Sequence, residues 1–582
     1  MNNFFKFFFA SLLALFVFAV LSFLVMLGIF SGLAATETPR TGDKAILVID
    51  LSRQYKEVSS FDPVQAVLNP DDSEQPTLYD VVELIGRARA DSSVKGIYLQ
   101  CGVNANGFAS SEELRNALLH FKSSGKFIYA YADIISQSAY HVANVADKIY
   151  CNPQGGLEWS GFSMELLFLK GTLEKLDITP QIFYAGKYKS ATEPFREYKM
   201  SEPSREQNLE LLQDLYSHFL LKTAEQRGID TAALHQYATG QQVNFAADAL
   251  RLKLVDGLRY DDEVKNELKN LVDVDRFDKL NFVGIEKYAQ IITPSTRGRD
   301  RIGVIFAEGD IIDGKGDRTQ IASVNYRNLI RKARLDKQTK AIVLRINSGG
   351  GSALASENIL RELILARKEK PVIISFGDVS ASGGYYLSCN ADSIFVQPNT
   401  ITGSIGVFAM IPNMEKFFNN KVGVTFDRVG TGGEDLSVFK PLSPLKARLI
   451  QASVDSTYFT FKSRVAEGRN LSMDYVDSIA QGRIWSGSQA VQLGLADRIG
   501  GIQDAIQAAA ALADLDEYRI RQYPGKQTLY DYFFNQGTES IKQSLLQQEM
   551  GDENFRIFES VQKLQHWLKT PQARLPFDFR IN

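Results

Sequence analysis

The sequence predicts an α/β fold built from two copies of one unit. Residues 95–153 align with residues 340–398 without a gap, at a constant offset of 245. A second pair of matching segments, 242–258 and 483–499, follows in the same order at an offset of 241. A self-match of this length indicates a duplicated structural unit. In both copies apolar runs alternate with amphipathic stretches, which is typical of parallel β-α-β units.

The first copy gives these elements in order along the chain. An apolar run at 96–100 predicts a strand, the amphipathic stretch 110–122 predicts a helix, and an apolar run at 127–131 predicts the next strand. A turn, a second helix and a third strand follow. The second copy repeats this order, so we expect both copies to share the same α/β architecture.

The matching segments divide the chain into five parts. We expect a membrane anchor at 1–35, a first α/β repeat at 45–283, a linker at 284–301, a second repeat at 302–520 and a C-terminal appendage at 521–582. The linker is polar and contains proline and glycine, and the appendage is polar and rich in glutamine. The sequence assigns no role to the appendage.

One long apolar stretch occupies the N-terminus. Residues 7–30 contain 24 residues and no charge, and about 20 apolar residues suffice to cross a bilayer. The apolar core of a cleaved signal peptide is shorter, about 7 to 15 residues. We therefore expect an uncleaved transmembrane helix in contact with the lipid bilayer. The flanking charges nearly balance, so charge alone leaves its orientation open.

Composition excludes some functions. The net charge of -3 and the isoelectric point near 6.1 provide no basic face for a nucleic acid. The three cysteines, Cys101, Cys151 and Cys389, share no metal-ligand spacing, and we expect buried apolar thiols. The sequence leaves open whether Cys101 and Cys151 form a disulfide.

The two copies differ in the polar residues that could carry chemistry. Opposite Ser382 of the second copy stands Gln137, and opposite the glycine run at 348–352 stands the sequence VNANG. An acyl-transfer site needs a nucleophile and nearby N–H donors for the oxyanion. Only the second copy offers both, with glycines after one strand and serines after the next. Ser382 is the candidate nucleophile, with Ser380 and Ser388 as alternatives.

A serine nucleophile needs a base, and no histidine lies between residues 300 and 520. A Ser-His-Asp triad within the second copy is therefore excluded. His141 of the first copy lies on a predicted helix, where we expect it to pack. A lysine base remains, as in Ser-Lys enzymes. Its pKa has to fall from about 10.4 to about 7 or 8, which burial in an apolar, uncharged pocket achieves.

Five ordered motifs resemble one known family. They are GKYKSATEPF at 186–195, RINSGGGSALASE at 345–357, GDVSASGGYYLS at 377–388, TITGSIGV at 400–407 and GRIWSGSQAVQLGLADRIGG at 482–501. Together they resemble the long form of the signal peptide peptidase A family, also called protease IV, over about residues 45–520. The resemblance implies tandem domains of the Clp-protease/crotonase-like fold and a Ser-Lys dyad.

The resemblance also implies roles for individual residues. The nucleophile falls on Ser382, the general base on Lys189, and the serine that positions the lysine amine on Ser404. The oxyanion donors fall on the backbone N–H groups of Gly350 and Gly383. Lysine and serine lie in different copies, so one complete site requires both halves, within one chain or across a subunit contact.

One position departs from the family pattern. The family usually has proline where this chain has Gly349, which makes the glycine loop less rigid without removing a donor. The acidic residues of GTGGEDLSVFK at 430–440 stand where the first copy has Lys189.

The family's activity sets the functional expectation. The resemblance implies a serine endopeptidase of the bacterial inner membrane that faces the periplasm and degrades cleaved signal peptides and other apolar peptides. It implies a homotetramer and no cofactor or metal. The alternatives are a crotonase-like acyl-CoA enzyme and a non-catalytic membrane scaffold. Natural substrates and the residues of the specificity pocket are left open.

Overall fold

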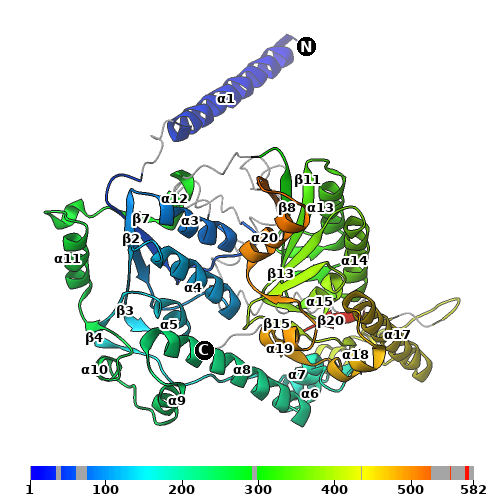
Figure 1. Ribbon diagram of the computed structural model, residues 1–582. Helices are drawn as coiled ribbons and strands as arrows, with labels where there is room; N and C mark the ends of the chain where they lie inside the picture. Colours follow the sequence, from blue (N-terminus) through cyan, green and yellow to red (C-terminus); the bar gives the residue numbers. More distant parts are fainter. Residues whose placement is uncertain are drawn as a thin grey trace.

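The computed structural model contains two α/β halves. It describes residues 2–34, 41–59, 75–291, 298–433, 436–525, 551 and 571–575. In Figure 1 the strands of the first half lie on the left and those of the second half on the right, and helix α1 (Asn2–Ala34) projects away from both. Within the described residues the strands form three sheets, one in each half and one that both halves share.

The first half is built on a six-stranded parallel sheet in the order β6-β4-β3-β2-β1-β7. Its strands are β1 (Ala45–Asp50), β2 (Val94–Gln100), β3 (Phe127–Ile135), β4 (Lys148–Leu157), β6 (Gly257–Leu258) and β7 (Phe282–Gly284). Its helices are α3 (Leu78–Ala90), α4 (Phe108–Lys122), α5 (Gln137–Ala143), α6 (Lys170–Lys175), α7 (Glu193–Arg196), α8 (Glu202–Arg227), α9 (Thr231–Thr239), α10 (Ala246–Arg251), α11 (Asp261–Leu271) and α12 (Ile285–Ile291).

The second half has a sheet in the order β17-β15-β13-β11-β8-β19, with β14 and β18 attached beside β13. All of its strand pairs are parallel except β15 with β17. Its strands are β8 (Arg301–Glu308), β11 (Thr339–Ser348), β13 (Val372–Ala381), β14 (Ser393–Val396), β15 (Ile401–Gly403), β17 (Ile484–Ser486), β18 (Arg498–Ile499) and β19 (Arg519–Tyr523). Its helices are α13 (Ser323–Leu335), α14 (Ala353–Arg367), α15 (Gly383–Ser388), α16 (Glu415–Phe417), α17 (Pro444–Arg469), α18 (Met473–Ile479), α19 (Gly487–Gln492) and α20 (Ile502–Leu512).

The duplication seen in the sequence is a duplication of structure. Helices α4 and α14 both have 15 residues and begin 245 residues apart, at Phe108 and Ala353. Strands β3 and β13 begin at the same offset, at Phe127 and Val372. The predicted α/β fold with parallel β-α-β units is therefore confirmed.

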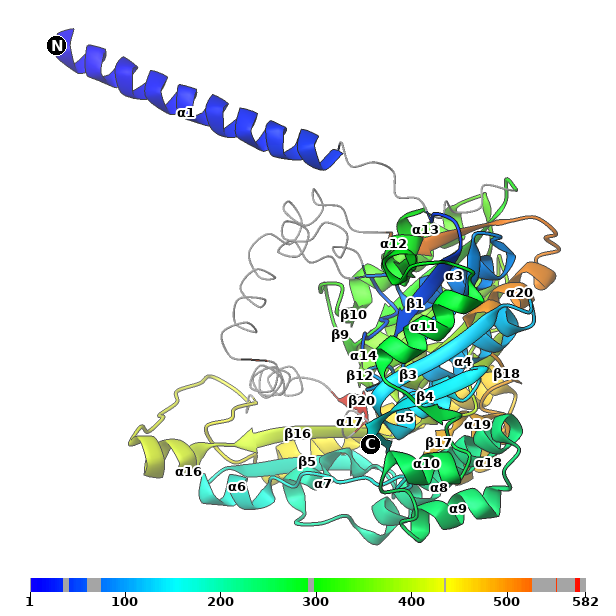
Figure 2. The same cartoon turned by 90° about the vertical axis from the view of Figure 1, so that its left-hand side faces the viewer.

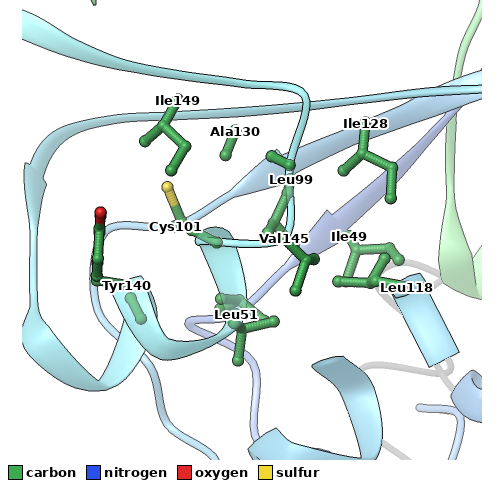
Figure 3. Packing of buried hydrophobic residues seen from close by; sticks show 14 of the residues in the cluster. Ile49, Leu51, Leu99, Cys101, Leu118, Ile128, Ala130, Tyr140, Val145 and Ile149 are labelled. Atoms are coloured by element: carbon green, nitrogen blue, oxygen red, sulfur yellow. The ribbon is translucent and has the colours of Figure 1, made fainter. Parts of the chain in front are cut away.

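The core of the first half lies between its parallel sheet and the helices that cross it. Figure 3 shows Ile49, Leu99, Ile128 and Ile149, one from each of β1 to β4, in one apolar cluster with Leu118 of α4 and Tyr140 of α5. Parallel strands that are covered by helices consist almost entirely of apolar residues. This is why these segments are apolar runs in the sequence. The three cysteines are free and buried, so the structure has no disulfide between Cys101 and Cys151.

The third sheet joins the two halves. Its order is β10-β9-β12-β20-β16-β5. Its strands are β5 (Thr179–Ala185), β9 (Asp310–Ile312), β10 (Gln320–Ala322), β12 (Gly350–Ser352), β16 (Val407–Asn413) and β20 (Gln572–Arg574). Figure 2 shows β5 of the first half and β16 of the second half side by side, and they pair antiparallel over seven residues. The segment that follows β5 is thereby held against the second half.

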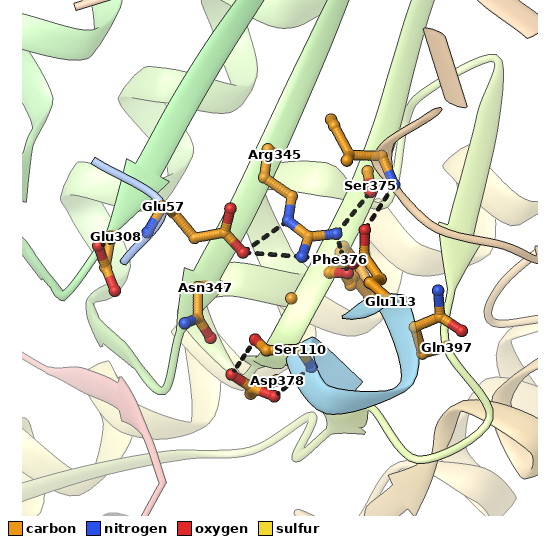
Figure 4. Close-up of polar contacts among 12 residues, drawn as sticks. Glu57, Ser110, Glu113, Glu308, Arg345, Asn347, Ser375, Phe376, Asp378 and Gln397 are labelled. Atoms are coloured by element: carbon orange, nitrogen blue, oxygen red, sulfur yellow. Dashed lines mark hydrogen bonds and ion pairs between the residues drawn. The ribbon is translucent and has the colours of Figure 1, made fainter. Parts of the chain in front are cut away.

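A buried cluster of charges also joins the halves. Arg345 of β11 is fully buried and lies 2.7 Å from Oε1 of Glu57 and 2.6 Å from Oε1 of Glu113, both in the first half. Its Nη1 also donates hydrogen bonds to Ser375 and to the carbonyl oxygen of Phe376 (Figure 4). Removing one partner of such a buried pair typically costs about 3 to 5 kcal/mol, so this cluster fixes how the halves meet.

Two expected boundaries differ from the structure. Residues 285–291 of the expected linker 284–301 form α12, because Ile285 and Tyr288 are buried in the core of the first half. The expected appendage 521–582 is not separate from the second half: its first residues complete β19, which pairs with β8, and its residues 572–574 form β20. Both differences have the same cause: a segment without a strong local pattern becomes a helix or strand through contacts with the core or sheet that it joins.

Within the described part of the chain, no helix is both long and apolar enough to cross a membrane. The transmembrane anchor expected at residues 7–30 stays a prediction.

The charge cluster predicts a pH dependence of stability. Burial raises the pKa of Glu57 to about 8, against the opposing charge of Arg345, so the folded chain keeps a proton that the unfolded chain loses near pH 4.5. Stability must then fall as the pH rises from about 5 to about 8. Buried Glu308, whose pKa is also raised by burial, acts in the same direction. We expect Glu57→Gln to flatten the decline in melting temperature over this range.

The control is Glu83→Gln, which removes a carboxylate from a partly exposed pair with Arg87. In this variant the melting temperature should fall with rising pH as steeply as in the wild type. The melting temperatures are measured by differential scanning fluorimetry. If the melting temperature of Glu57→Gln falls with pH as steeply as that of the wild type, the raised pKa of Glu57 is contradicted.

Candidate active site

Ser382 lies at the junction between strand β13 and helix α15. Its φ of 54° and ψ of -111° are unusual for a residue with a side chain, and such strain is found mainly at functional positions. Its own N–H donates to the carbonyl oxygen of Gly403 (2.8 Å), and its carbonyl accepts from Tyr386 (2.8 Å). The side chain does not cap the helix that it precedes. The hydroxyl of Ser382 is therefore not used as a cap for α15.

Lys189 comes from the first half and meets this hydroxyl. It follows β5 in the chain, and its Nζ lies 2.8 Å from Oγ of Ser382. The same Nζ lies 2.9 Å from Oγ of Ser404 and 3.2 Å from the carbonyl oxygen of Ser404. The structure thus brings three of the residues implied by the family resemblance together within one chain.

The surroundings of Lys189 favour a neutral amine. The residue is 1% exposed, and its burial lowers the pKa of the amine well below the usual 10.5. The polar groups in contact with Nζ are two hydroxyls and a carbonyl, which carry no charge to offset the lost hydration. Burial in these surroundings therefore favours the neutral form of the Lys189 amine over the charged form.

The backbone around Lys189 is held by the neighbouring helix and loop. Gln207 of α8 donates to the carbonyl oxygen of Tyr188 (3.0 Å) and to Oγ of Ser190 (3.1 Å). The N–H of Tyr188 donates to the carbonyl oxygen of Gln481 (2.7 Å). These hydrogen bonds hold the backbone on both sides of Lys189, so the long side chain starts from a fixed backbone position.

Two glycines to which the sequence assigned no role allow this close approach. A Cβ atom on Gly406 would lie 3.1 Å from Cδ of Lys189, and one on Gly482 would lie 2.6 Å from its backbone nitrogen. Gly482 also has a φ of 78°, where a side chain is strained. Both glycines stand inside quoted motifs, TITGSIGV and GRIWSGS, but the sequence does not indicate what they touch.

Gly350 and Gly383 lie next to each other beside the nucleophile. A Cβ atom on Gly350 would lie 2.8 Å from the backbone nitrogen of Gly383, and Gly350 has a φ of 104°. In this structure the N–H of Gly350 donates to Oγ of Ser348 (3.1 Å). The two glycines from neighbouring strand ends therefore form one glycine-lined surface at the nucleophile.

The alternative serines and the other polar residues near the site have structural surroundings. Oγ of Ser388 donates to backbone carbonyl oxygens within its own helix, and Ser380 is fully buried. Lys187 is exposed and lies over the ring of Tyr188. Gln137 at the equivalent site of the first half bonds with the backbone of Ser160 and Gly161. The acidic residues 434–435, aligned with Lys189, lie outside the described residues.

One cluster has side chains of the metal-ligating kind. Glu112, His141 and His218 place their ligand atoms within 4.8 Å of one another. Oε2 of Glu112 lies 2.7 Å from His141 and 3.2 Å from His218, which are hydrogen-bond distances. The equivalent cluster in the second half contains Glu357, Tyr386 and Arg464, joined by hydrogen bonds and an ion pair. Both clusters pack helices against each other, as expected for His141.

Comparisons with known proteins find relatives over most of the chain. The chain matches Peptidase family S49 over residues 120–275 and 364–516, more than half of its 582 residues. It is 35% identical to Protease 4 of Salmonella typhi, covering 81% of this chain and 78% of that protein. It is 36% identical to Protease 4 of Haemophilus influenzae, covering 75% and 73%.

Solved structures match more weakly. A mutant of ClpP1 from Listeria monocytogenes matches 35% of this chain and 94% of its own, with 13% identity and a TM-score of 0.24. The assignment to the Clp-protease/crotonase-like fold therefore stays a prediction.

The close contact between Gly482 and Lys189 leads to a testable prediction. Gly482→Ala adds a methyl group at positive φ that overlaps the backbone of Lys189, so the amine should shift from Ser382. We expect kcat for peptide hydrolysis to fall about 100-fold, since a misplacement of about 1 Å costs this much. The matched control is Gly423→Ala, which has a φ of 75° and open space around the added methyl. It carries the same backbone strain and should keep its kcat; equal losses in both variants would contradict a role in positioning.

The matched regions include both halves of the site, and the relatives are similar over most of their length. The chain therefore belongs to Peptidase family S49, the protease IV and signal peptide peptidase A family of serine peptidases.

Proposed function

We propose that this peptidase cleaves its substrates with a Ser-Lys dyad formed by Ser382 and Lys189. The observation that carries the proposal is the 2.8 Å approach of a fully buried lysine amine to a serine hydroxyl. The lowered pKa of Lys189 supports its role as a base, because only the neutral amine can accept the hydroxyl proton. A neighbouring histidine is not required.

The proposed first step is attack on the peptide carbonyl. Lys189 takes the proton from Oγ of Ser382 as this oxygen bonds to the carbonyl carbon, and the carbonyl oxygen becomes an oxyanion. A neutral amine has two N–H groups and one lone pair. If the N–H groups point to Oγ and the carbonyl oxygen of Ser404, the lone pair is left to face Ser382. Ser404 is thereby proposed to position the base.

The proposed oxyanion donors are the N–H groups of Gly350 and Gly383. Their adjacency beside Ser382 supports this role, because two N–H groups from neighbouring strand ends can meet at one point. The protonated Lys189 then gives its proton to the leaving amine. A water molecule, deprotonated by Lys189, releases the acyl group from Ser382 and returns the hydroxyl.

Membership in a serine peptidase family argues against the two alternative functions. A crotonase-like acyl-CoA enzyme needs no covalent serine, and a membrane scaffold needs no dyad. A buried lysine without a charged partner costs stability, and a non-catalytic protein would have no reason to keep it. Neither alternative explains the contact between Lys189 and Ser382.

The proposed substrates are apolar peptides, including cleaved signal peptides, on the periplasmic side of the bacterial inner membrane. The supporting observation is the N-terminal segment. In helix α1 the described apolar side chains from Phe7 to Leu21 are exposed, and an apolar surface of this kind suits a lipid environment. The resemblance further suggests a homotetramer without nucleic acid or cofactor.

The anchor has a direct test. Residues 7–30 should keep the full-length chain in the membrane fraction after extraction at high pH, because apolar contact with lipid survives the loss of surface charge contacts. A chain lacking residues 1–35 should appear in the soluble fraction. Release of the full-length chain by the same extraction would contradict an integral anchor.

The dyad predicts the effect of two substitutions. Ser382→Ala and Lys189→Met should each lower kcat for an apolar peptide amide by at least about 1,000-fold, and both should lose labelling by a fluorophosphonate. The controls are Ser380→Ala, a buried serine two residues earlier, and Lys187→Met, an exposed lysine two residues earlier. Near-normal activity in either dyad variant would sink the proposal.

The same variants have two pH readouts. In the wild type, kcat/KM should rise as the pH passes upward through the lowered pKa of Lys189 and then level off, because the rate follows the neutral fraction. The buried amine also favours unfolding below its ordinary pKa, since the unfolded chain binds the proton more readily. Lys189→Met should therefore have a higher melting temperature than the wild type at neutral pH.

A further inference from the structure

A buried cluster of two histidines and one carboxylate lies where three helices of the first half meet. Glu112 comes from α4, His141 from α5 and His218 from α8, and α5 contacts both of the other helices (Figure 1). The side chains of Glu112 and His141 are almost fully buried, and that of His218 is 13% exposed. The cluster is therefore closest to solvent at His218.

Both imidazoles present the same nitrogen to the same oxygen. Nε2 of His141 lies 2.7 Å, and Nε2 of His218 lies 3.2 Å, from Oε2 of Glu112. All three atoms lie within 4.8 Å of one another. Ligand atoms at about 2.1 Å from a tetrahedral Zn²⁺ ion are about 3.4 Å apart. The two distances to Oε2 need to grow by less than about 1 Å to admit the ion.

The three atoms form a donor set that zinc prefers. Imidazole nitrogen and carboxylate oxygen are both common ligands of Zn²⁺, whereas Mg²⁺ and Ca²⁺ take oxygen ligands. The ring centroids of Phe108 and Phe219 lie 4.6 Å and 6.0 Å from that of His141. An apolar surrounding of this kind excludes bulk water and strengthens the attraction between a carboxylate and a cation.

The equivalent cluster in the second half already contains a permanent cation. Glu357 and Tyr386 follow Glu112 and His141 at the offset of 245. The hydroxyl of Tyr386 donates to Glu357, and Nη2 of Arg464 forms an ion pair with the same carboxylate at 2.6 Å. The negative charge of Glu357 is therefore balanced within the protein.

Glu112 has no such partner. Among the described residues no lysine or arginine forms an ion pair with it, and its charged or polar contacts are the two histidines. Arg115, one turn further along α4, donates instead to the carbonyl oxygen of Lys222 (3.3 Å). A cation bound between the imidazoles and Glu112 would supply the contact that Arg464 supplies in the second half.

We propose that Glu112, His141 and His218 form a binding site for one Zn²⁺ ion. Each histidine coordinates through Nε2 and carries its proton on Nδ1, Glu112 coordinates through Oε2, and water takes the fourth position on the side of His218. The inference rests on this cluster and not on the proposed dyad. Nothing in the family resemblance implies such a site.

The surroundings of His141 set the expected affinity. Nδ1 of His141 has no hydrogen-bond partner among the described residues. A metal-bound histidine usually donates this second N–H to an acceptor, and loss of such a partner typically lowers metal affinity 10- to 100-fold. We therefore expect a dissociation constant of about 1 µM rather than one in the nanomolar range.

A bound ion would join α8 to α4 and α5. Gln207 lies on α8 about three turns before His218, and its side chain bonds to the backbone of Tyr188 and to Ser190 on either side of Lys189. The ion would thus steady the helix that holds the proposed base, without touching the reacting groups.

The test is a calorimetric titration of Zn²⁺ into the full-length chain, after removal of any histidine tag and treatment with a chelator. We expect one ion per chain, and a melting temperature that rises by about 5 °C at about 100 times the dissociation constant. His218→Ala should weaken binding by at least about 100-fold, because even outer partners of a ligand contribute 10- to 100-fold. The matched control is His120→Ala, an exposed histidine on the same helix as Glu112, which should bind as the wild type does.

Glu112→Gln is the second ligand variant, since it keeps the size of the side chain and removes its charge. It should also lose binding, with an unchanged circular dichroism spectrum. Mg²⁺ should cause neither heat nor a shift in melting temperature. Co²⁺ bound to the wild-type chain should give the strong visible absorption of a tetrahedral ion.

Three results would overturn the site. They are absence of Zn²⁺ binding to the wild type, equal binding by the wild type and both ligand variants, and the weak absorption of octahedral Co²⁺. Fluorophosphonate labelling of Ser382 tests the dyad separately. Loss of that labelling would overturn the dyad and leave the metal site standing.

Discussion

The structure depends on the burial of one amine. Lys189 has lost its hydration and gained only hydroxyl and carbonyl partners. This arrangement is unfavourable for a charged lysine and favourable for a neutral one. The pairing of β5 with β16, the bonds from Gln207 and the two close glycines all hold a residue that would otherwise turn toward water. The buried amine therefore lowers the stability of the fold in return for a lysine that can serve as the proposed base.

The duplicated halves show how one site is assembled from two similar units. In the second half the residue before α15 is a strained serine, and at the equivalent place in the first half Gln137 bonds to the backbone of a neighbouring loop. In the first half this position therefore has a structural role. The half that lacks the proposed nucleophile supplies the proposed base, so neither half contains both groups of the proposed dyad.

The repeated fold and the main residues of the candidate site are predictable from the sequence, each from a different kind of pattern. Buried parallel strands give apolar runs, and the constant offset places the equivalent helices α4 and α14 at the expected residues. Ser382 stood out because its partner in the first half is Gln137. Lys189 required the family motif, since composition does not distinguish it from Lys187. The roles of Gly406 and Gly482 lie in contacts between segments far apart in the sequence, which no local pattern records.

The least predictable elements were those whose order comes from a neighbour. Residues 285–291 and 572–574 are polar or lack strong periodicity, yet one packs on the first core and the other fills a gap in the shared sheet. Local sequence preference is weak in such segments, and the surrounding structure decides their conformation. The sequence therefore predicts a linker at the first segment and an appendage at the second.

The charge cluster at Arg345 also bears on when the enzyme becomes active during its synthesis. Glu57, Glu113 and Lys189 leave the ribosome well before Arg345 and Ser382. Since the first half holds no nucleophile at the equivalent position, the nascent chain has nothing with which to cut. The proposed base and the proposed nucleophile come together only when both halves are folded and joined, as they are at this cluster. Dividing the proposed dyad between the halves thus delays proteolysis until the fold is complete.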